Sequence, residues 1–169
     1  HAPSAAVLET VGAMSNWSDA SAQGRALGVG FTYSFGSPVA QVIEVARRGD
    51  GSIGLEKVWI AADVGVALDP GNIEAQLTGG CLFGLSAAVM GEITFDRGEA
   101  QQSNFYDYDA LRMGAAPAFE VQVLENASYL GGVGEIGTPP AAPALGNALF
   151  ALTGNRVRRL PFNQAFDFA

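Results

Sequence analysis

The chain has 169 residues, of which 49% are hydrophobic and only 15% are charged, and its formal net charge at pH 7 is −8. This composition is that of a folded chain with a sizeable core, and it excludes an intrinsically disordered tail. Because an acidic surface repels phosphate backbones, nucleic acid is excluded as an expected partner.

The first elements that the sequence predicts are a short helix and two strand segments. Residues 5–14 form the helix, and the small, polar residues 18–27 form a loop. Residues 28–45 then form two strand segments separated by a bend or bulge at residues 36–38. Aromatic residues alternate along this stretch, and we interpret them as core residues without a site role: Phe31, Tyr33 and Phe35.

A hairpin turn and a long helix follow. Residues 48–52 carry a strong turn signal, and Ile53 to Val64 is the predicted return strand. Asp69 and Pro70 are the expected N-cap and first residue of a helix that runs from about Asn72 to Met90.

Three glycines punctuate this otherwise apolar helix, namely Gly79, Gly80 and Gly84. Each glycine costs ~1 kcal/mol relative to alanine in a helix interior. We therefore expect these positions to pack closely against a neighbouring backbone or a ligand.

The C-terminal half is predicted to contain a hairpin, a strand and a last helix. Residues 92–106 form the hairpin, and residues 119–123 alternate as in a half-buried strand. The helix spans residues 139–152 and ends at Gly154, and residues 156–162 form a short strand or extension. The sum is a single α+β domain with mainly antiparallel strands and two buried helices.

The single cysteine and the single histidine exclude several kinds of site. Cys81 lies in an apolar run, where we expect a small buried hydrophobe, and one thiol cannot form an internal disulfide, a zinc site or an iron–sulfur site. The only histidine is His1, so a histidine-based triad or zinc site is not expected, and we expect no metal ligands from this chain.

No run of the sequence reaches the ~18 apolar residues of a membrane helix. No signal peptide is recognisable, and the chain does not begin with Met. We therefore expect a processed or excised piece of a longer polypeptide.

The strongest functional signal is the segment Gly131-Gly-Val-Gly-Glu-Ile-Gly-Thr-Pro-Pro140. It places one carboxylate, Glu135, on a glycine-rich turn, where it can come very close to a ligand. A helix is expected to begin just after it, and the positive end of that helix favours the ionised carboxylate, whereas burial would oppose it. These features suggest a general base, and the alternatives are a loop glutamate or a helix-capping residue.

Three of the nine basic residues form a cluster, namely Arg156, Arg158 and Arg159. Such a cluster suits an anionic cofactor tail or an acidic subunit. The alternative is a solvated, basic end of a strand, which charge alone favours.

Three groups of motifs occur in a fixed order along the chain. The first group is Ala62-Asp63-Val-Gly65, Asp69-Pro70 and Gln76-Leu-Thr-Gly79-Gly80. The second is Gln102-Ser-Asn104-Phe-Tyr-Asp-Tyr108, and the third is Gly132-Val-Gly134-Glu135 with Pro139-Pro140-Ala-Ala-Pro143-Ala-Leu-Gly-Asn147. The ordered set resembles the C-terminal end of the molybdenum-binding subunit of the xanthine dehydrogenase/aldehyde oxidase family. It is most similar to the branch of isoquinoline 1-oxidoreductase beta subunits and bacterial membrane-associated aldehyde dehydrogenases.

This resemblance implies that residues 1–169 are the C-terminal part of a molybdopterin-binding domain. The implied enzyme oxidises an aldehyde, or hydroxylates an N-heterocycle, with water as the oxygen source. Its cofactor would be molybdopterin as the cytosine dinucleotide. Its partners would be the remainder of the molybdenum subunit, a small subunit with 2Fe–2S clusters and a cytochrome c. The implied location is the periplasmic face of the inner membrane, with the cytoplasm as the alternative.

The resemblance also implies roles for individual residues. In that family the glutamate of the Gly-Glu motif lies beside the molybdenum and takes a proton from a metal-bound hydroxide, and Glu135 has that position here. Gln76 falls where relatives place a glutamine against the pterin, although a helix residue bonded to nearby backbone is the alternative. Val133 and Gly134 would lie against the pterin by their adjacency to Glu135.

The substrate channel is the third implied site, and Asn104 and Tyr106 would approach it. For these two residues, packing within the hairpin is the more common fate. Ile136 stands where many relatives have proline, which we expect to alter the turn and not the chemistry.

The glycine-rich segments that hold the pterin and its nucleotide in the family have no counterpart in these residues. On this reasoning the chain supplies one wall of the site and its base. The rival class of function is a non-catalytic binding or assembly module that kept the fold after losing the chemistry.

Overall fold

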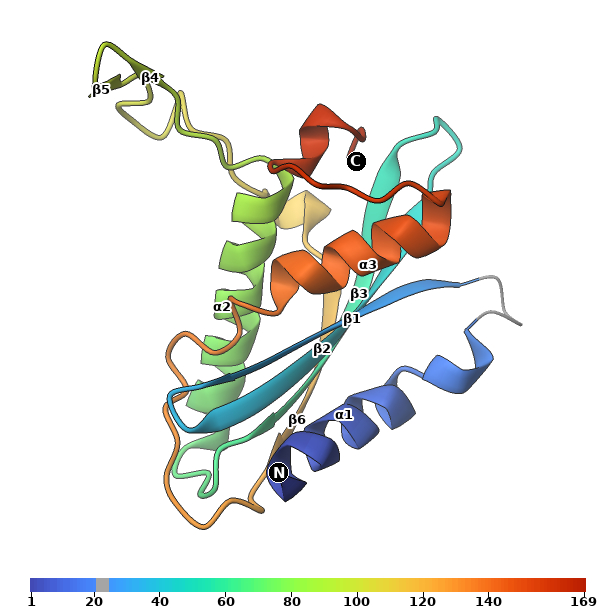
Figure 1. The fold of residues 1–169 in the computed structure, drawn as a ribbon, viewed down its shortest axis with the longest axis vertical. Coiled ribbons are helices and arrows are strands. Elements are labelled where there is room, and N and C mark those ends of the chain that lie inside the picture. The colour runs from blue at the N-terminus through green and yellow to red at the C-terminus, as the bar shows by residue number, and fades with distance from the viewer. Residues whose placement is uncertain (21–24) are drawn as a thin grey trace.

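The computed structural model describes residues 1–20 and 25–169, and its main element is a four-stranded sheet with helices on both faces (Figure 1). The sheet has the strand order β1-β2-β3-β6, in which β1, β2 and β3 are antiparallel and β6 runs parallel to β3. The strands are β1 (Ala26–Ser34), β2 (Ser37–Arg47), β3 (Ile53–Asp63) and β6 (Ala118–Leu124). The predicted α+β fold with mainly antiparallel strands is confirmed.

Helices α2 (Pro70–Val89) and α3 (Ala141–Thr153) pack on one face of the sheet, and α1 (Ala2–Met14) packs on the other (Figure 1). The two predicted buried helices correspond to α2 and α3, while α1 contributes the fully buried Val7 and Val11 to a second, smaller core. Among the described residues, three short 3₁₀ turns complete the helical elements: η1 (Trp17–Asp19), η2 (Met113–Ala115) and η3 (Phe162–Gln164). No helix in the described part of the chain is long and apolar enough to cross a membrane.

The two-stranded hairpin of β4 (Phe95–Asp96) and β5 (Glu99–Ala100) lies within the predicted hairpin region. It forms the tip of an arm, made of residues 90–112 between α2 and η2, that projects beyond the end of α2 (Figure 1). The arm lies apart from the sheet, so its side chains are presented outward.

The connection between β1 and β2 is a tight hairpin, so the predicted bend or bulge was wrong. Ser34 pairs with Ser37, and both turn residues have positive φ, 53° at Phe35 and 82° at Gly36. Positive φ at both central positions is the turn that matches the twist of a hairpin, but it is normally signalled by Asn-Gly or Asp-Gly. Strand β1 also begins two residues earlier than expected, and residues 21–24 of the predicted loop lie outside the described residues.

The interpretation of the aromatic residues of β1 and its turn as core residues was also wrong, since Phe31, Tyr33 and Phe35 are 40%, 50% and 65% exposed. The opposite side of β1 carries Gly28 and Gly30, where an added Cβ would overlap the α3 backbone. Helix α3 thus packs directly against the glycine side of β1. The aromatic side is left on the face that α1 covers only in part.

Several local predictions are confirmed. The Asp69 side chain accepts a hydrogen bond from the Asn72 amide at 3.1 Å, so it is the N-cap of α2, with Pro70 as the first helical residue. Gly154 ends α3 with φ 74°. The C-terminal segment is an extension, joined to the sheet region by one bridge between Ile53 and Phe168.

Candidate active site

The glycine-rich segment lies against α2, and glycines on both sides make the contact possible. A Cβ at Gly84 would lie 2.7 Å from the Thr138 carbonyl oxygen, and one at Gly137 would overlap the Leu77 carbonyl oxygen. A Cβ at Gly80 would lie 3.3 Å from Thr138 Oγ1. The expected close packing of the α2 glycines is therefore confirmed for Gly80 and Gly84.

Hydrogen bonds fix the backbone on the C-terminal side of Glu135. The Thr138 amide donates to the Glu135 carbonyl at 3.0 Å, and the Thr138 hydroxyl donates to the Gly80 carbonyl at 3.0 Å. From the sheet, Gln41 Nε2 donates to the Gly137 carbonyl at 2.7 Å in a buried position. Glu135 thus stands on a turn that is tied to both α2 and β2.

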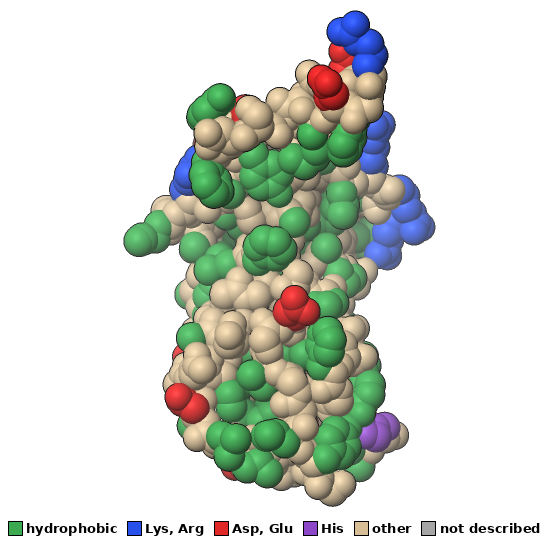
Figure 2. Space-filling model, turned by 90° about the vertical axis from the view of Figure 1, so that its left-hand side faces the viewer, with side chains coloured by type: hydrophobic (Ala, Val, Ile, Leu, Met, Phe, Trp, Pro, Cys, Tyr) green, Lys and Arg blue, Asp and Glu red, His purple; other side chains and the backbone are tan. Residues whose placement is uncertain are grey.

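Glu135 itself is exposed and lines an open cavity of about 640 Å³. The other lining residues are Ser34, Phe35, Gly79, Gly80, Phe83, Gly134, Thr138 and Pro139. Figure 2 shows the side of the molecule on which α2 lies, where hydrophobic surface is extensive and charged side chains are few. A carboxylate in such surroundings can accept a proton from a bound group.

The structure argues against one alternative for Glu135. The N-cap of α3 is Pro140, with no side-chain capping hydrogen bond, so Glu135 does not cap this helix. Helix α3 also begins at Ala141, two residues later than predicted. Because the effect of a helix end falls off within one turn, the helix is a weaker support for the carboxylate than the sequence suggested.

The other predicted cofactor-binding residues differ in whether they line the cavity next to Glu135. Gly134 lines the same cavity as Glu135, and a Cβ there would meet nothing within 4 Å. Val133 lines a neighbouring hollow of about 220 Å³ with Leu68 and Ile73. Gln76 is exposed on α2, one turn before Gly80, and lines neither hollow.

Asn104 and Tyr106 lie on the arm and line neither of these cavities. Asn104 shapes the arm, because its amide donates to Asp107 Oδ1 at 2.8 Å and its Oδ1 accepts from the Phe105 amide at 2.8 Å. Backbone hydrogen bonds from Ser103 and Asn104 lower the pKa of the Asp107 carboxyl. The roles of Asn104 and Tyr106 at a substrate stay predictions.

The neighbouring aromatic residues of the arm come nearer to the site. Phe105 and Tyr108 line a hollow of about 230 Å³ that shares Phe83 with the Glu135 cavity. Phe83 is 70% exposed and therefore stands between the two hollows on the open side of α2.

Sequence reasoning assigned no role to three polar residues that matter here. Buried Gln41 binds the Gly137 carbonyl, and its Oε1 lies 3.5 Å from Cys81 Sγ. Buried Asp63 accepts hydrogen bonds at 3.1 Å from the amides of residues 65, 126 and 127, which ties the segment after β6 to the end of β3. The signal in both cases was a polar residue within or at the end of an apolar strand.

The third missed residue is Ser34, at the end of β1. Ser34 lines the Glu135 cavity, and its hydroxyl oxygen is buried without a hydrogen-bond partner among the described residues. A buried hydroxyl without a partner costs free energy.

Cys81 is fully buried, and burial raises the pKa of its thiol to about 12. Among residues 1–20 and 25–169, no three His, Cys, Asp or Glu side chains gather where they could hold a metal ion. The described residues therefore provide a carboxylate and a cavity wall, and no metal-ligand set.

Comparison with known proteins gives the family. Residues 4–117 match the family model described as the molybdopterin cofactor-binding domain. The chain belongs to this family. As a molybdopterin cofactor-binding domain, it is part of the larger group of molybdenum hydroxylases related to xanthine oxidase.

Two curated relatives show the same relationship. The chain is 39% identical over 165 residues to the isoquinoline 1-oxidoreductase subunit beta of Brevundimonas diminuta, covering 95% of this chain and 21% of the relative. It is 32% identical over 118 residues to the membrane-bound aldehyde dehydrogenase [pyrroloquinoline-quinone] of Gluconacetobacter polyoxogenes, covering 70% and 15%. The chain thus spans about a fifth or less of the length of these relatives.

Solved structures share the fold. The Cu,Mo-CO dehydrogenase matches with a TM-score of 0.64 at 21% identity, over 73% of this chain and 17% of that one. The aldehyde oxidoreductase from Desulfovibrio desulfuricans ATCC 27774 matches with a TM-score of 0.64 at 22% identity, over 77% and 15%. The matches place this α+β arrangement within enzymes that are several times longer.

The Glu135 cavity fits one side of a molybdopterin. Gly79 and Gly134 leave open space where a Cβ would meet nothing within 4 Å, so a flat group can approach the backbone there. Ser34 lines the same cavity. The cavity is open, so the residues of this chain enclose it on one side only.

Proposed function

We propose that this domain supplies the general base and one wall of the cofactor site in a molybdenum-dependent oxidoreductase. The reaction class is oxidation of an aldehyde, or hydroxylation of an N-heterocycle, with oxygen from water. The observation that carries the proposal is the position of Glu135, on an anchored glycine-rich turn at the edge of a cavity bounded by Gly79 and Gly134 of the same chain.

The proposed role of Glu135 is to accept a proton at a carboxylate oxygen. General-base catalysis requires a carboxylate held within hydrogen-bond reach of the proton that it removes. Two hydrogen bonds support this role, because they limit the positions that the turn can take: Thr138 Oγ1 donates to the Gly80 carbonyl of α2, and Gln41 Nε2 donates to the Gly137 carbonyl.

The proposed cofactor-binding residues act by different means. Gly134 allows close approach, the Val133 side chain provides apolar contact, and the Gln76 amide can both donate and accept a hydrogen bond. Bound molybdopterin would supply the two-electron redox chemistry that none of these side chains can provide.

The proposal extends to the rest of the assembly. We infer that the cofactor is the cytosine dinucleotide form, that 2Fe–2S clusters lie on a partner subunit, and that a cytochrome c accepts electrons further on. The relatives support a multi-subunit assembly, since the Brevundimonas protein is named as a beta subunit. We further propose the periplasmic face of the inner membrane as the location, with the cytoplasm as the alternative.

The test is Glu135→Gln in the assembled enzyme, which keeps the shape of the side chain and removes the base. Turnover should fall by about 10²–10⁴-fold, the usual contribution of general-base catalysis, while molybdenum content stays normal. Glu74→Gln is the matched control, because Glu74 is an exposed glutamate of α2 that does not line this cavity. Unchanged turnover in Glu135→Gln would show that Glu135 is not the base.

A second candidate function is a non-catalytic docking module. It is favoured by the large exposed aromatic residues near α2, since Phe105 is 89% exposed and Tyr106 is 83% exposed. Metal and pterin analysis of the intact complex separates the two candidates. A complex that contains neither molybdenum nor pterin supports the docking module.

A further inference from the structure

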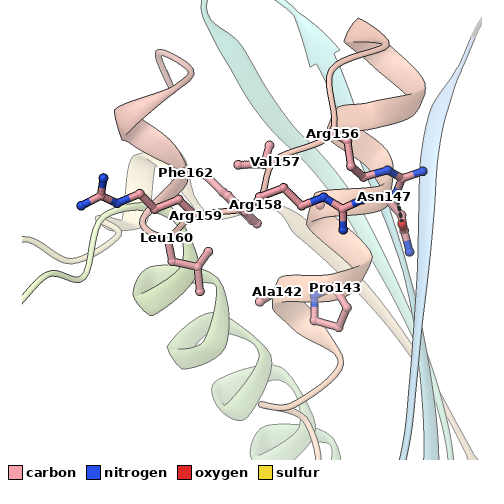
Figure 3. Close-up of a pocket in the computed structure, with 10 residues that line it drawn as sticks. Ala142, Pro143, Asn147, Arg156, Val157, Arg158, Arg159, Leu160 and Phe162 are labelled. Atoms are coloured by element: carbon pink, nitrogen blue, oxygen red, sulfur yellow. Dashed lines mark hydrogen bonds between the residues drawn. The ribbon is translucent and has the colours of Figure 1, made fainter.

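The extended segment after α3 forms a surface that the proposed function does not use. Arg156, Arg158 and Arg159 lie on it and, with part of α3, line a hollow of about 420 Å³ (Figure 3). These arginines are three of the nine basic residues in a chain with a net charge of −8. Positive charge is therefore concentrated at one place on an acidic protein.

The Arg156 side chain is held in a defined orientation. Its Nη1 donates to Asn147 Oδ1 at 2.9 Å, and Asn147 Nδ2 in turn donates to the Val29 carbonyl at 3.0 Å. Its Cζ lies 3.8 Å from the centroid of the Phe150 ring. A guanidinium has five N–H donors, so most of the Arg156 donors stay available for another group.

Arg158 extends toward the same side as Arg156, whereas Arg159 points the opposite way (Figure 3). Within residues 1–20 and 25–169, no carboxylate lies within 4.0 Å of these three guanidiniums, although Arg25 pairs with Glu44 at 2.9 Å. Two guanidiniums that extend toward the same side, with no carboxylate nearby, are most stable when an anion binds between them.

The floor of the hollow is apolar, which narrows the kind of anion that fits. Leu160 is 51% exposed, whereas Phe162, the aromatic residue that lines this hollow, is only 5% exposed. No open aromatic face is therefore available for a nucleobase among the residues that line the hollow. Carboxylates next to an aliphatic side chain match this surface better than a nucleotide does. The remaining floor residues are Ala142, Pro143, Gly146 and Val157.

We propose that Arg156 and Arg158 form the docking site for an acidic segment of a neighbouring polypeptide. Carboxylates of that segment pair with the two guanidiniums, and an aliphatic side chain beside them covers Leu160. Charge complementarity supports this occupant. Moreover, the Brevundimonas relative is named as a beta subunit, so the neighbouring polypeptide that we propose is a partner subunit.

The test is Arg158→Lys in the intact protein with its natural partners, treated with a carbodiimide. This reagent joins an amine directly to a carboxylate that it touches, and mass spectrometry then identifies the attached peptide. The matched control is Arg159→Lys, because Arg159 points away from Arg158 (Figure 3). The expected result is a cross-link from position 158 to an Asp or Glu outside these 169 residues, at least about tenfold more abundant than from position 159, since only a salt-bridged carboxylate is held at this distance.

A cross-link only to carboxylates of this chain, or to none, would overturn the proposal. A second measurement is Arg158→Glu, an exposed position where reversal of charge leaves the core intact. Association with the neighbouring polypeptide should weaken by about tenfold or more, measured by native mass spectrometry over a range of ionic strength, with Arg159→Glu as control. If Arg158→Glu instead releases a bound nucleotide and leaves association unchanged, the site binds phosphate and the proposal fails. Neither readout depends on turnover, so the result is independent of the role of Glu135.

Discussion

Two glycine-to-alanine substitutions in α2 should have opposite effects on stability: Gly79→Ala should stabilise the protein, and Gly84→Ala should destabilise it. At Gly84 the new Cβ would lie 2.7 Å from the Thr138 carbonyl oxygen and 2.9 Å from the Ala141 Cβ. Both distances are well inside van der Waals contact, so the Thr138 turn or the start of α3 must move away. At Gly79 the new Cβ meets nothing within 4 Å.

The magnitudes follow from two effects. Alanine is favoured over glycine inside a helix by about 0.5–1 kcal/mol, because glycine loses more backbone entropy on folding. Gly79→Ala should therefore stabilise α2 by about this amount. In Gly84→Ala the same gain is outweighed by overpacking, which typically costs about 1–3 kcal/mol, so a net loss of about 1–2 kcal/mol is expected.

The assay is hydrogen exchange of the α2 amides in the intact protein, which reports local opening free energies. Exchange in Gly84→Ala should become faster by about tenfold, since ~1.4 kcal/mol corresponds to a factor of ten. Gly79→Ala should exchange more slowly than the parent protein. Equal stabilisation by both substitutions would refute the close contact between α2 and the Thr138 turn.

Two further outcomes test the surroundings of the site. Gln41→Leu removes the buried donor to the Gly137 carbonyl, and it should cost about 1–3 kcal/mol of stability and lower turnover together, as measured by denaturant unfolding and steady-state kinetics of the assembled enzyme. Burial raises the pKa of Cys81 to about 12, so its thiol should stay protonated and resist iodoacetamide at pH 8 until the protein is unfolded; rapid labelling of the folded protein would contradict its burial.

Much of the fold could be predicted because its signals are local. The N-cap and first residue of α2 are adjacent in the sequence, and the stop of α3 needs only Gly154. The β1–β2 hairpin was missed because Phe35-Gly36 lacks the residues that usually mark a turn with positive φ. The β1 aromatic residues were misplaced because period-two alternation gives two faces, and only the packing of α3 against Gly28 and Gly30 decides between them.

The candidate site also contains some residues that the sequence could place together and others that it could not. Glu135 and Gly134 are neighbours on one turn, so the sequence pattern could place them together. Gln41 is separated by 96 residues from the carbonyl that it binds. Ser34 is likewise far from Glu135 in the sequence, although both residues line the same cavity. Such contacts depend on tertiary packing, which cannot be predicted from the pattern of one segment.

Hydrogen bonds hold the glycine-rich loop on both sides of Glu135, so the loop loses its conformational freedom when the domain folds. Asp63 holds the amides of residues 126 and 127, and Gln41 and Thr138 hold the backbone after Glu135. Ordering one residue costs about 1–2 kcal/mol of backbone entropy, and glycine loses more than any other residue. Here that loss occurs once, when the domain folds, and is not repeated each time a ligand enters the cavity.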